Sequence, residues 1–202
     1  MTLQIRNLLS DRRASGAAEF ALVLPLLILL LFGIIDTGRY FWQLNKSEKA
    51  TQMGARMAIV TKPVSPDLVG ASYVSGLTKA GYLVPASALG TLQCTNAGCT
   101  CQTAPCPAGN GSVDAAAFNV IATRMSLMNP QIAPANVVIS YSGSGLGYAG
   151  SADETMDVQP LVTVSVRNMQ FSPIALFGFS GWGLPAASAT LTAEDSSGTF
   201  SN

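Results

Sequence analysis

An apolar run near the N-terminus limits the possible folds of this chain more than any other feature. Residues 20 to 35, FALVLPLLILLLFGII, contain no charged side chain, and seven of the sixteen are leucine. In a helix that rises about 1.5 Å per residue, this run and the small residues before it extend over roughly 24 to 28 Å, close to the hydrocarbon thickness of a bilayer. The sequence therefore predicts one membrane-spanning helix.

A cleavable secretory signal is the competing interpretation of this run, because the basic residues Arg6, Arg12 and Arg13 precede it. The residues that follow, IIDTGRYFW, contain no cleavage site of the usual small-x-small kind, which favours an uncleaved anchor. Three basic residues precede the run and three follow soon after it, so the positive-inside rule does not determine its orientation.

All four cysteines lie within thirteen residues, CTNAGCTCQTAPC, where Gly, Thr, Asn and Pro predict a loop. Their spacing lacks the paired C-x-x-C arms of zinc ribbons and the chain has no histidine, which favours two disulfides. Three pairings are open, and Cys99 with Cys101 would close the tightest ring. Disulfides need an oxidising compartment, so this interpretation places the residues after the span outside the cytoplasm. The alternative is four inert or zinc-bound thiols on the cytoplasmic side. The cysteines are Cys94, Cys99, Cys101 and Cys106.

Residues 36 to 60 contain no proline and predict a helix that continues from the anchor. It should end before TKPVSPD, where two prolines stop it. Ala50, Gly54 and Ala58 recur every four residues and place small side chains on one face. This helix-packing face would either admit another helix closely or pack against the chain's own globular domain.

Residues 61 to 202 predict a small α+β domain. A short helix is expected near 66 to 80, and a longer one at 112 to 128 with Ser112 as the candidate N-cap. Three segments rich in β-branched residues predict strands, so we expect a helix packed on an antiparallel sheet of three or more strands. The strand candidates are 136 to 142, 158 to 167 and 187 to 194.

Two linking segments have two interpretations each. Residues 141 to 157 contain several glycines and the carboxylates of Asp153, Glu154 and Asp157, but their spacing does not match the calcium-loop motif. A flexible, solvated connection is the better prediction. Residues 171 to 185, FSPIALFGFSGWGLP, predict a short helical turn that covers the sheet, with an exposed docking surface as the alternative.

No pattern in the chain indicates catalysis. Histidine is absent, and neither a G-x-S-x-G elbow nor a phosphate-binding glycine loop appears. A net charge of zero with scattered Lys and Arg gives no nucleic-acid footprint. We therefore predict that the protein is not an enzyme, with no catalytic residue, no cofactor or metal, no small-molecule substrate and no nucleic-acid partner.

Residues 12 to 59, RRASGAAEFALVLPLLILLLFGIIDTGRYFWQLNKSEKATQMGARMAI, resemble the TadE-like segment of tight-adherence (Tad) pilus proteins. The shared features are a basic pair, small residues, Glu-Phe, an apolar helix with an early proline, and a polar helix ending in Gly-Ala-Arg. The resemblance implies a minor pilin or pseudopilin, type IV pilin-like, that supports pilus biogenesis and surface adherence. It further implies one pass through the bacterial inner membrane, with a cytoplasmic N-terminus and a periplasmic C-terminal domain, or a place in the extracellular pilus.

The implied partners are the membrane, other pilins, the Tad assembly machinery and a prepilin peptidase. A second hypothesis is a permanently membrane-anchored periplasmic binding protein with no pilus role. The chain then divides into a basic leader (1 to 14), the TadE-like segment (15 to 60) and an extracytoplasmic α+β domain (61 to 202) with a disulfide loop at 94 to 106.

The resemblance also assigns roles to single residues. The Glu-Phe pair of the pilin-like motif falls on Glu19 and Phe20, which places the expected peptidase cut between Ala14 and Ser15; glycine more often precedes such a cut. The new amine of Ser15 in one subunit could then pair with Glu19 of a neighbour, because a buried charge is tolerable only with a partner. Pro25, which lacks an amide hydrogen, would let the helix bend.

Overall fold

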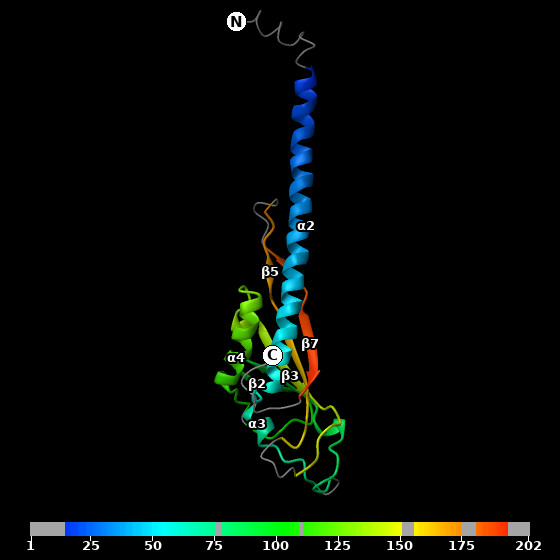
Figure 1. Ribbon diagram of the computed structural model, residues 1–202, viewed down its shortest axis with the longest axis vertical. Coiled ribbons are helices and arrows are strands. Elements are labelled where there is room, and N and C mark those ends of the chain that lie inside the picture. The colour runs from blue at the N-terminus through cyan, green and yellow to red at the C-terminus, as the bar shows by residue number, and fades with distance from the viewer. Residues whose placement is uncertain (1–14, 76–77, 110, 151–155, 175–180, 194–202) are drawn as a thin grey trace, which may run out of the picture. The chain divides into compact units, whose positions relative to one another are not determined.

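The computed structural model describes residues 15–75, 78–109, 111–150, 156–174 and 181–193 (Figure 1). The chain forms two compact units. The first consists of residues 1–42 and 171–182, and the second of residues 43–170 and 183–202. The long helix α2, Ser15–Val60, contributes to both units and has Pro25 in its interior. A long apolar helix followed by an α+β domain confirms the predicted fold class.

The second unit is built on a five-stranded antiparallel sheet with the strand order β2-β1-β3-β4-β7. The strand β3 occupies the centre of the sheet. Four of its six residues are buried, and Val137, Ile139 and Tyr141 are at most 1% exposed. The strands are β1 (Thr91–Thr95), β2 (Gly98–Thr103), β3 (Val137–Ser142), β4 (Leu161–Val166) and β7 (Ala187–Thr192).

Two helices contribute further residues to the core of this unit. Figure 1 shows α4, Ala115–Met128, beside the C-terminal part of α2. The helix α4 buries Phe118, Ile121, Ala122 and Met125. The buried residues of α2 recur at intervals of three and four, which is the spacing of one helix face. In the C-terminal half of α2 they are Ser47, Ala50, Thr51, Gly54, Ala55, Met57 and Ala58.

The helix boundaries differ from the sequence predictions in two places. The helix α4 begins at Ala115 with Asp114, not Ser112, as its N-cap. The Asp114 carboxylate accepts hydrogen bonds from the backbone N–H groups of Ala116 (3.0 Å) and Ala117 (3.1 Å), which have no partner within the helix. The helix expected near 66 to 80 is a single turn, α3, Pro66–Val69. Short 3₁₀ turns occur at Ala86–Ala88 (η2) and Pro134–Asn136 (η3).

The segment around the cysteines is a β-hairpin rather than a loop. The strands β1 and β2 pair with Cys94 opposite Cys99, and β1 also pairs with β3. The turn residues of this segment lie mostly at the hairpin tip and after β2, so they bound the strands instead of replacing them.

The two linking segments also differ from expectation within their described parts. Residues 170–171 and 182–183 form the strands β5 (Gln170–Phe171) and β6 (Trp182–Gly183) of a two-stranded sheet, and not a helical turn. In the other segment, the backbone of Ala149 bonds with that of Gly81 and Tyr82, and Asp157 is buried and accepts a bond from the Tyr73 N–H (2.9 Å). Asp153, Glu154 and residues 175 to 180 lie outside the described residues.

Candidate assembly interface

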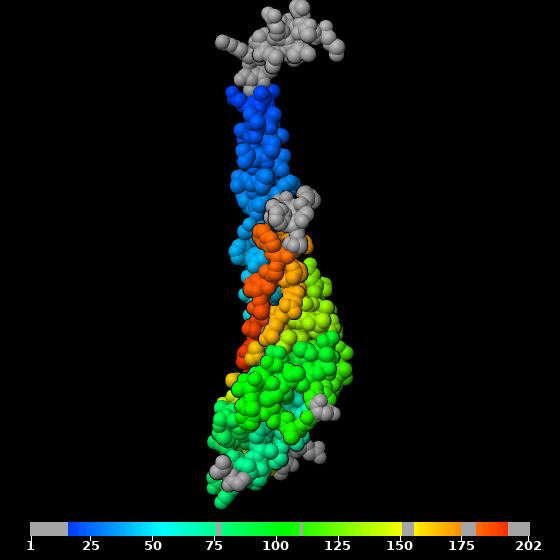
Figure 2. Space-filling view, turned by 180° about the vertical axis from the view of Figure 1, so that it is seen from behind, coloured from blue at the N-terminus to red at the C-terminus, as the bar shows by residue number. Residues whose placement is uncertain are grey.

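The N-terminal half of α2 exposes its apolar side chains on all sides. Leu22 is 76% exposed and Leu26 is 72% exposed. A window of 18 residues in this helix has a mean hydropathy of 2.7, and none of it is buried within the chain. In Figure 2 these side chains, coloured blue, form an open rod on the face shown. Burying a leucine side chain is worth about 1.5–3 kcal/mol, so this surface is stable only against lipid or other apolar helices.

The residues of the pilin-like motif lie on this exposed half. Ser15 is helical, and the side chains of Glu19 and Phe20 are exposed, Phe20 by 63%. Glu19 follows Ser15 by four residues, which is about 6 Å along the helix axis. Ala14 lies outside the described residues. The motif therefore places one exposed carboxylate, that of Glu19, at the N-terminal end of the apolar run.

Pro25 lies inside the same exposed half. Proline has no N–H to donate, so the carbonyl of Ala21, four residues earlier, lacks its usual helical donor. One missing backbone bond lowers the cost of bending the helix at this point.

Where the apolar run ends, a polar and aromatic cluster ties residues 171–174 to α2. The Asp36 Oδ1 atom accepts from Arg39 Nη1 (2.9 Å) and from the backbone N–H of Ile174 (3.0 Å). The Arg39 guanidinium lies 5.3 Å from the centre of the Phe171 ring, and the Tyr40 ring meets that ring edge-on at 5.5 Å. These are cation–π and aromatic contacts of favourable geometry. Sequence reasoning missed this cluster; its only local signal is that Asp36 is the first charge after the run.

The small-residue face of α2 packs against the second unit itself. Ala50, Gly54 and Ala58 are buried. A Cβ atom added to Gly54 would lie 2.7 Å from the Met125 sulfur and 3.1 Å from a methyl carbon of Val164. The glycine therefore allows α2 to approach both α4 and β4, and this is the second of the two arrangements that the sequence left open.

The family comparison assigns this helix. A family model described as TadE-like protein matches residues 14–56. The match covers about a fifth of the chain, and this N-terminal segment is similar to TadE-like proteins. No curated protein and no solved structure matches the chain. The match indicates an association with Tad pili, and the long apolar helix fits a single-pass membrane anchor.

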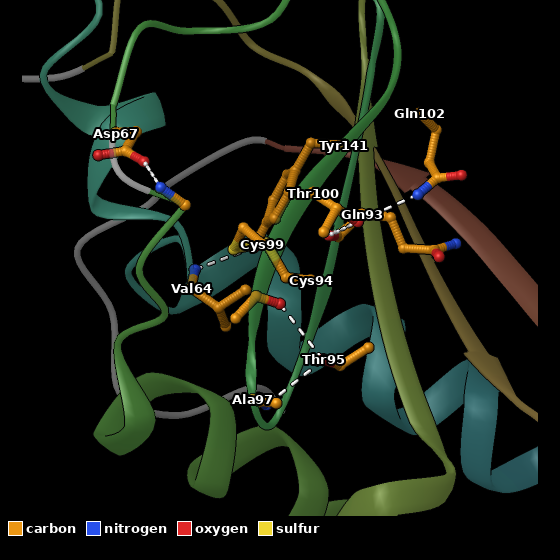
Figure 3. The surroundings of a disulfide bond; sticks show 12 residues. Val64, Asp67, Gln93, Cys94, Thr95, Ala97, Cys99, Thr100, Gln102 and Tyr141 are labelled. Atoms are coloured by element: carbon orange, nitrogen blue, oxygen red, sulfur yellow. Dashed lines mark hydrogen bonds between the residues drawn. A yellow bond between two sulfur atoms is a disulfide. The ribbon is translucent and has the colours of Figure 1, made fainter.

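The part of the second unit that follows α2 is called the head below. It carries two disulfides, Cys94–Cys99 and Cys101–Cys106. Figure 3 shows the first of them beside Tyr141. Cys94 is fully buried, whereas Cys101 is exposed. The first disulfide links two directly opposite residues of the β1–β2 hairpin, and the second links β2 to the chain that follows it.

The same region contains buried hydrogen bonds that join the head to the end of α2. The Tyr141 hydroxyl accepts from the backbone N–H of Val64 (3.0 Å), four residues after α2 ends. Burial raises the pKa of Tyr141. Burial and the nearby Asp157 carboxylate raise the pKa of Tyr73 to about 12. Within the described part of the chain, no three His, Cys, Asp or Glu side chains gather closely enough to hold a metal ion.

Proposed function

We propose that this chain is a minor pilin or pseudopilin of a Tad-type type IV pilus, a structural component that supports pilus biogenesis and surface adherence. The observation that carries the proposal is the exposed apolar half of a helix that belongs to a TadE-like segment. Such a surface requires lipid before assembly and neighbouring helices after it. The partners in this proposal are the membrane, other pilins and the Tad assembly machinery.

In this proposal α2 crosses the bacterial inner membrane once, with the N-terminus in the cytoplasm and residues 61–202 in the periplasm or, after assembly, on the extracellular pilus. The two disulfides support this orientation, because such bonds persist in oxidising compartments and are rare in the cytoplasm. A membrane-permeant thiol label applied to native, non-reduced cells should fail to modify the four cysteines. Complete labelling without reductant would contradict the orientation.

A prepilin peptidase would cut between Ala14 and Ser15 and leave a positive amine on Ser15. Glu19 of one subunit would pair with the Ser15 amine of its neighbour as the helices enter a bundle. A carboxylate within the membrane boundary costs a few kcal/mol without a partner, so pairing favours the register in which the two charges meet. The bend permitted by Pro25 would ease the transfer of the helix from bilayer to bundle.

Two experiments test these steps. N-terminal sequencing of the mature protein should give Ser15 as the first residue, and an intact leader would count against processing. Glu19→Gln should leave membrane insertion unchanged but reduce incorporation into sheared pili. Glu48→Gln, at an exposed position of the same helix beyond the apolar run, is the matched control and should incorporate normally. Equal incorporation of the two variants would refute the pairing.

Co-purification with sheared filaments distinguishes this proposal from a permanently anchored binding protein. A pilin that enters the fibre appears in the sheared fraction, whereas a permanent anchor stays with the membrane. A pseudopilin that acts only at the membrane would stay with the membrane fraction as well. Deleting its gene should nevertheless abolish piliation, and expressing the intact sequence should restore it.

A further inference from the structure

Two aromatic side chains follow the apolar run on α2. Phe41 is 56% exposed and Trp42 is 63% exposed. Trp42 comes seven residues after Ile35, the last residue of the run, which is about 10 Å along the helix axis. The headgroup layer on each side of a bilayer is roughly 5 to 8 Å thick. The Cα atoms of both residues therefore lie just beyond that layer when the run spans the hydrocarbon core. Helical side chains point back toward the N-terminus of the helix, so these two large side chains reach into the layer.

Residues 171–174 are held beside residues 36–40 of the helix, between the run and Phe41, by contacts inside the first unit. Ile174 bonds to Asp36, one residue past the run, and the Phe171 ring packs on Tyr40, five residues past it. From Phe171 to Ile174 the chain thus runs toward the end of the apolar run. The contacts fix these residues within roughly 2 to 8 Å of the hydrocarbon boundary, by the helical rise of 1.5 Å per residue.

The side chains that this segment exposes are apolar. Ile174 is 45% exposed, and Trp182 is 53% exposed. Trp182 belongs to β6, which pairs with β5 and so lies beside Phe171. The charged groups of the cluster, Asp36 and Arg39, pair with each other at 2.9 Å and carry no net charge together. A neutral, aromatic-rich surface at this depth has the chemistry of the Trp and Tyr belts that border membrane proteins.

We propose that Phe41, Trp42, Ile174 and Trp182 form a second membrane contact, which binds the headgroup layer of the phospholipid bilayer that α2 spans. The occupant is lipid because the surface continues directly from the membrane-spanning run. The inference rests on the proposed insertion of α2. It adds that a segment some 130 residues later in the chain returns to the membrane surface, and it depends only on the described residues on either side of 175–180.

The two tryptophans of the chain, Trp42 and Trp182, allow a direct test. Trp42→Phe leaves Trp182 as the only tryptophan, and Trp182→Phe leaves Trp42. The full chain of each variant is reconstituted into phosphatidylcholine vesicles with bromine placed either just below the headgroup or near the end of the acyl chain. Bromine quenches tryptophan emission at short range, and acrylamide quenches it from water. Circular dichroism and protection of the cysteines from a thiol label verify that each variant is folded.

We expect Trp182 in the Trp42→Phe variant to lose more emission with shallow bromine than with deep bromine, and to be less sensitive to acrylamide in vesicles than in detergent-free denaturant. If neither bromine position quenches the emission of Trp182, the proposal is overturned. This holds whether acrylamide quenches Trp182, which would place it in water, or does not, which would place it under a protein surface. Quenching of Trp42 in the Trp182→Phe variant distinguishes loss of the second contact from failure of α2 to insert into the membrane. Quenching of Trp42 without Trp182 removes only the second contact, whereas quenching of neither removes the membrane placement of α2 as well.

Discussion

The hydroxyl group of Tyr141 provides a quantitative test of how the head is joined to α2. Tyr141 is 1% exposed, and its hydroxyl accepts the backbone N–H of Val64 at 3.0 Å. Tyr141→Phe keeps the ring and its packing but leaves this buried N–H without its acceptor. A buried donor that loses its partner costs about 1–3 kcal/mol, more than a typical hydrogen bond contributes in net terms. We expect the free energy of unfolding to fall by that amount.

The measurement is urea unfolding of the full chain in detergent micelles, with both disulfides intact and near-UV circular dichroism as the signal. Tyr148→Phe is the matched control, because Tyr148 is 58% exposed and surface substitutions usually change stability by less than about 0.5 kcal/mol. A Tyr141→Phe variant as stable as the Tyr148→Phe variant would refute the reasoning, since it would show that the Val64 N–H does not depend on this hydroxyl.

The Tyr141→Phe variant should also differ from the unchanged protein in alkaline solution. Burial raises the pKa of Tyr141, and the pKa of Tyr73 rises to about 12. An unfolded tyrosine titrates near pH 10, so above that pH the unfolded chain releases protons that the folded chain retains. Stability is therefore complete below about pH 10 and falls as the pH rises toward the folded pKa values, by at most about 1.4 kcal/mol per pH unit for each tyrosine. Tyr73 contributes less because it is partly exposed to solvent. Tyr141→Phe should lose stability less steeply above pH 10 than the unchanged protein.

Two further predictions concern the head. Both disulfides join cysteines five residues apart, so each closes a loop worth about 2 kcal/mol of chain entropy. Replacing Cys94 and Cys99 by alanine should nevertheless lower the urea midpoint more than replacing Cys101 and Cys106, because only the first pair also leaves a cavity; equal midpoints would contradict this. Asp114→Ala should destabilise the protein by about 1 kcal/mol through loss of the α4 N-cap, whereas Asp114→Asn, which can still cap, should retain most of that stability in the same assay.

The strands that could be predicted are those whose own side chains show the pattern. The segments of β3, β4 and β7 are rich in β-branched residues, and the predicted ranges enclose the observed strands to within a few residues. The strands β1 and β2 were not predicted, because Gly, Asn, Thr and Pro near the cysteines indicated a loop. In β1 this concealed an alternation of buried and half-buried side chains. Leu92 and Cys94 point inward while their neighbours are half-buried. Pairing with β3, some forty-five residues away, decides the conformation, and no local pattern reports it.

In the candidate interface too, features that depend on neighbouring residues could be predicted from the sequence, whereas those that depend on distant residues could not. The apolar run and its Glu-Phe motif are local patterns, so the sequence was sufficient to locate them. The Asp36 cluster depends on Ile174, which is 138 residues away in sequence. Ser and Asp are both good N-caps, so the sequence alone does not decide between Ser112 and Asp114. The choice depends on where the helical backbone of α4 begins, which is at Ala115, directly after Asp114.

The two halves of α2 therefore have different tasks, and this constrains how the chain can assemble. In the C-terminal half, the small-residue face at Ala50, Gly54 and Ala58 is buried, with Met125 and Val164 against Gly54, so a helix of another subunit cannot use that face without unfolding the head. The N-terminal half has no such stripe; it is apolar all round and exposed all round, which is the pattern of a helix surrounded by lipid or by other helices. In the proposed pilus, contacts between neighbouring helices are therefore expected from residues 16–35, in which Glu19 is the only carboxylate.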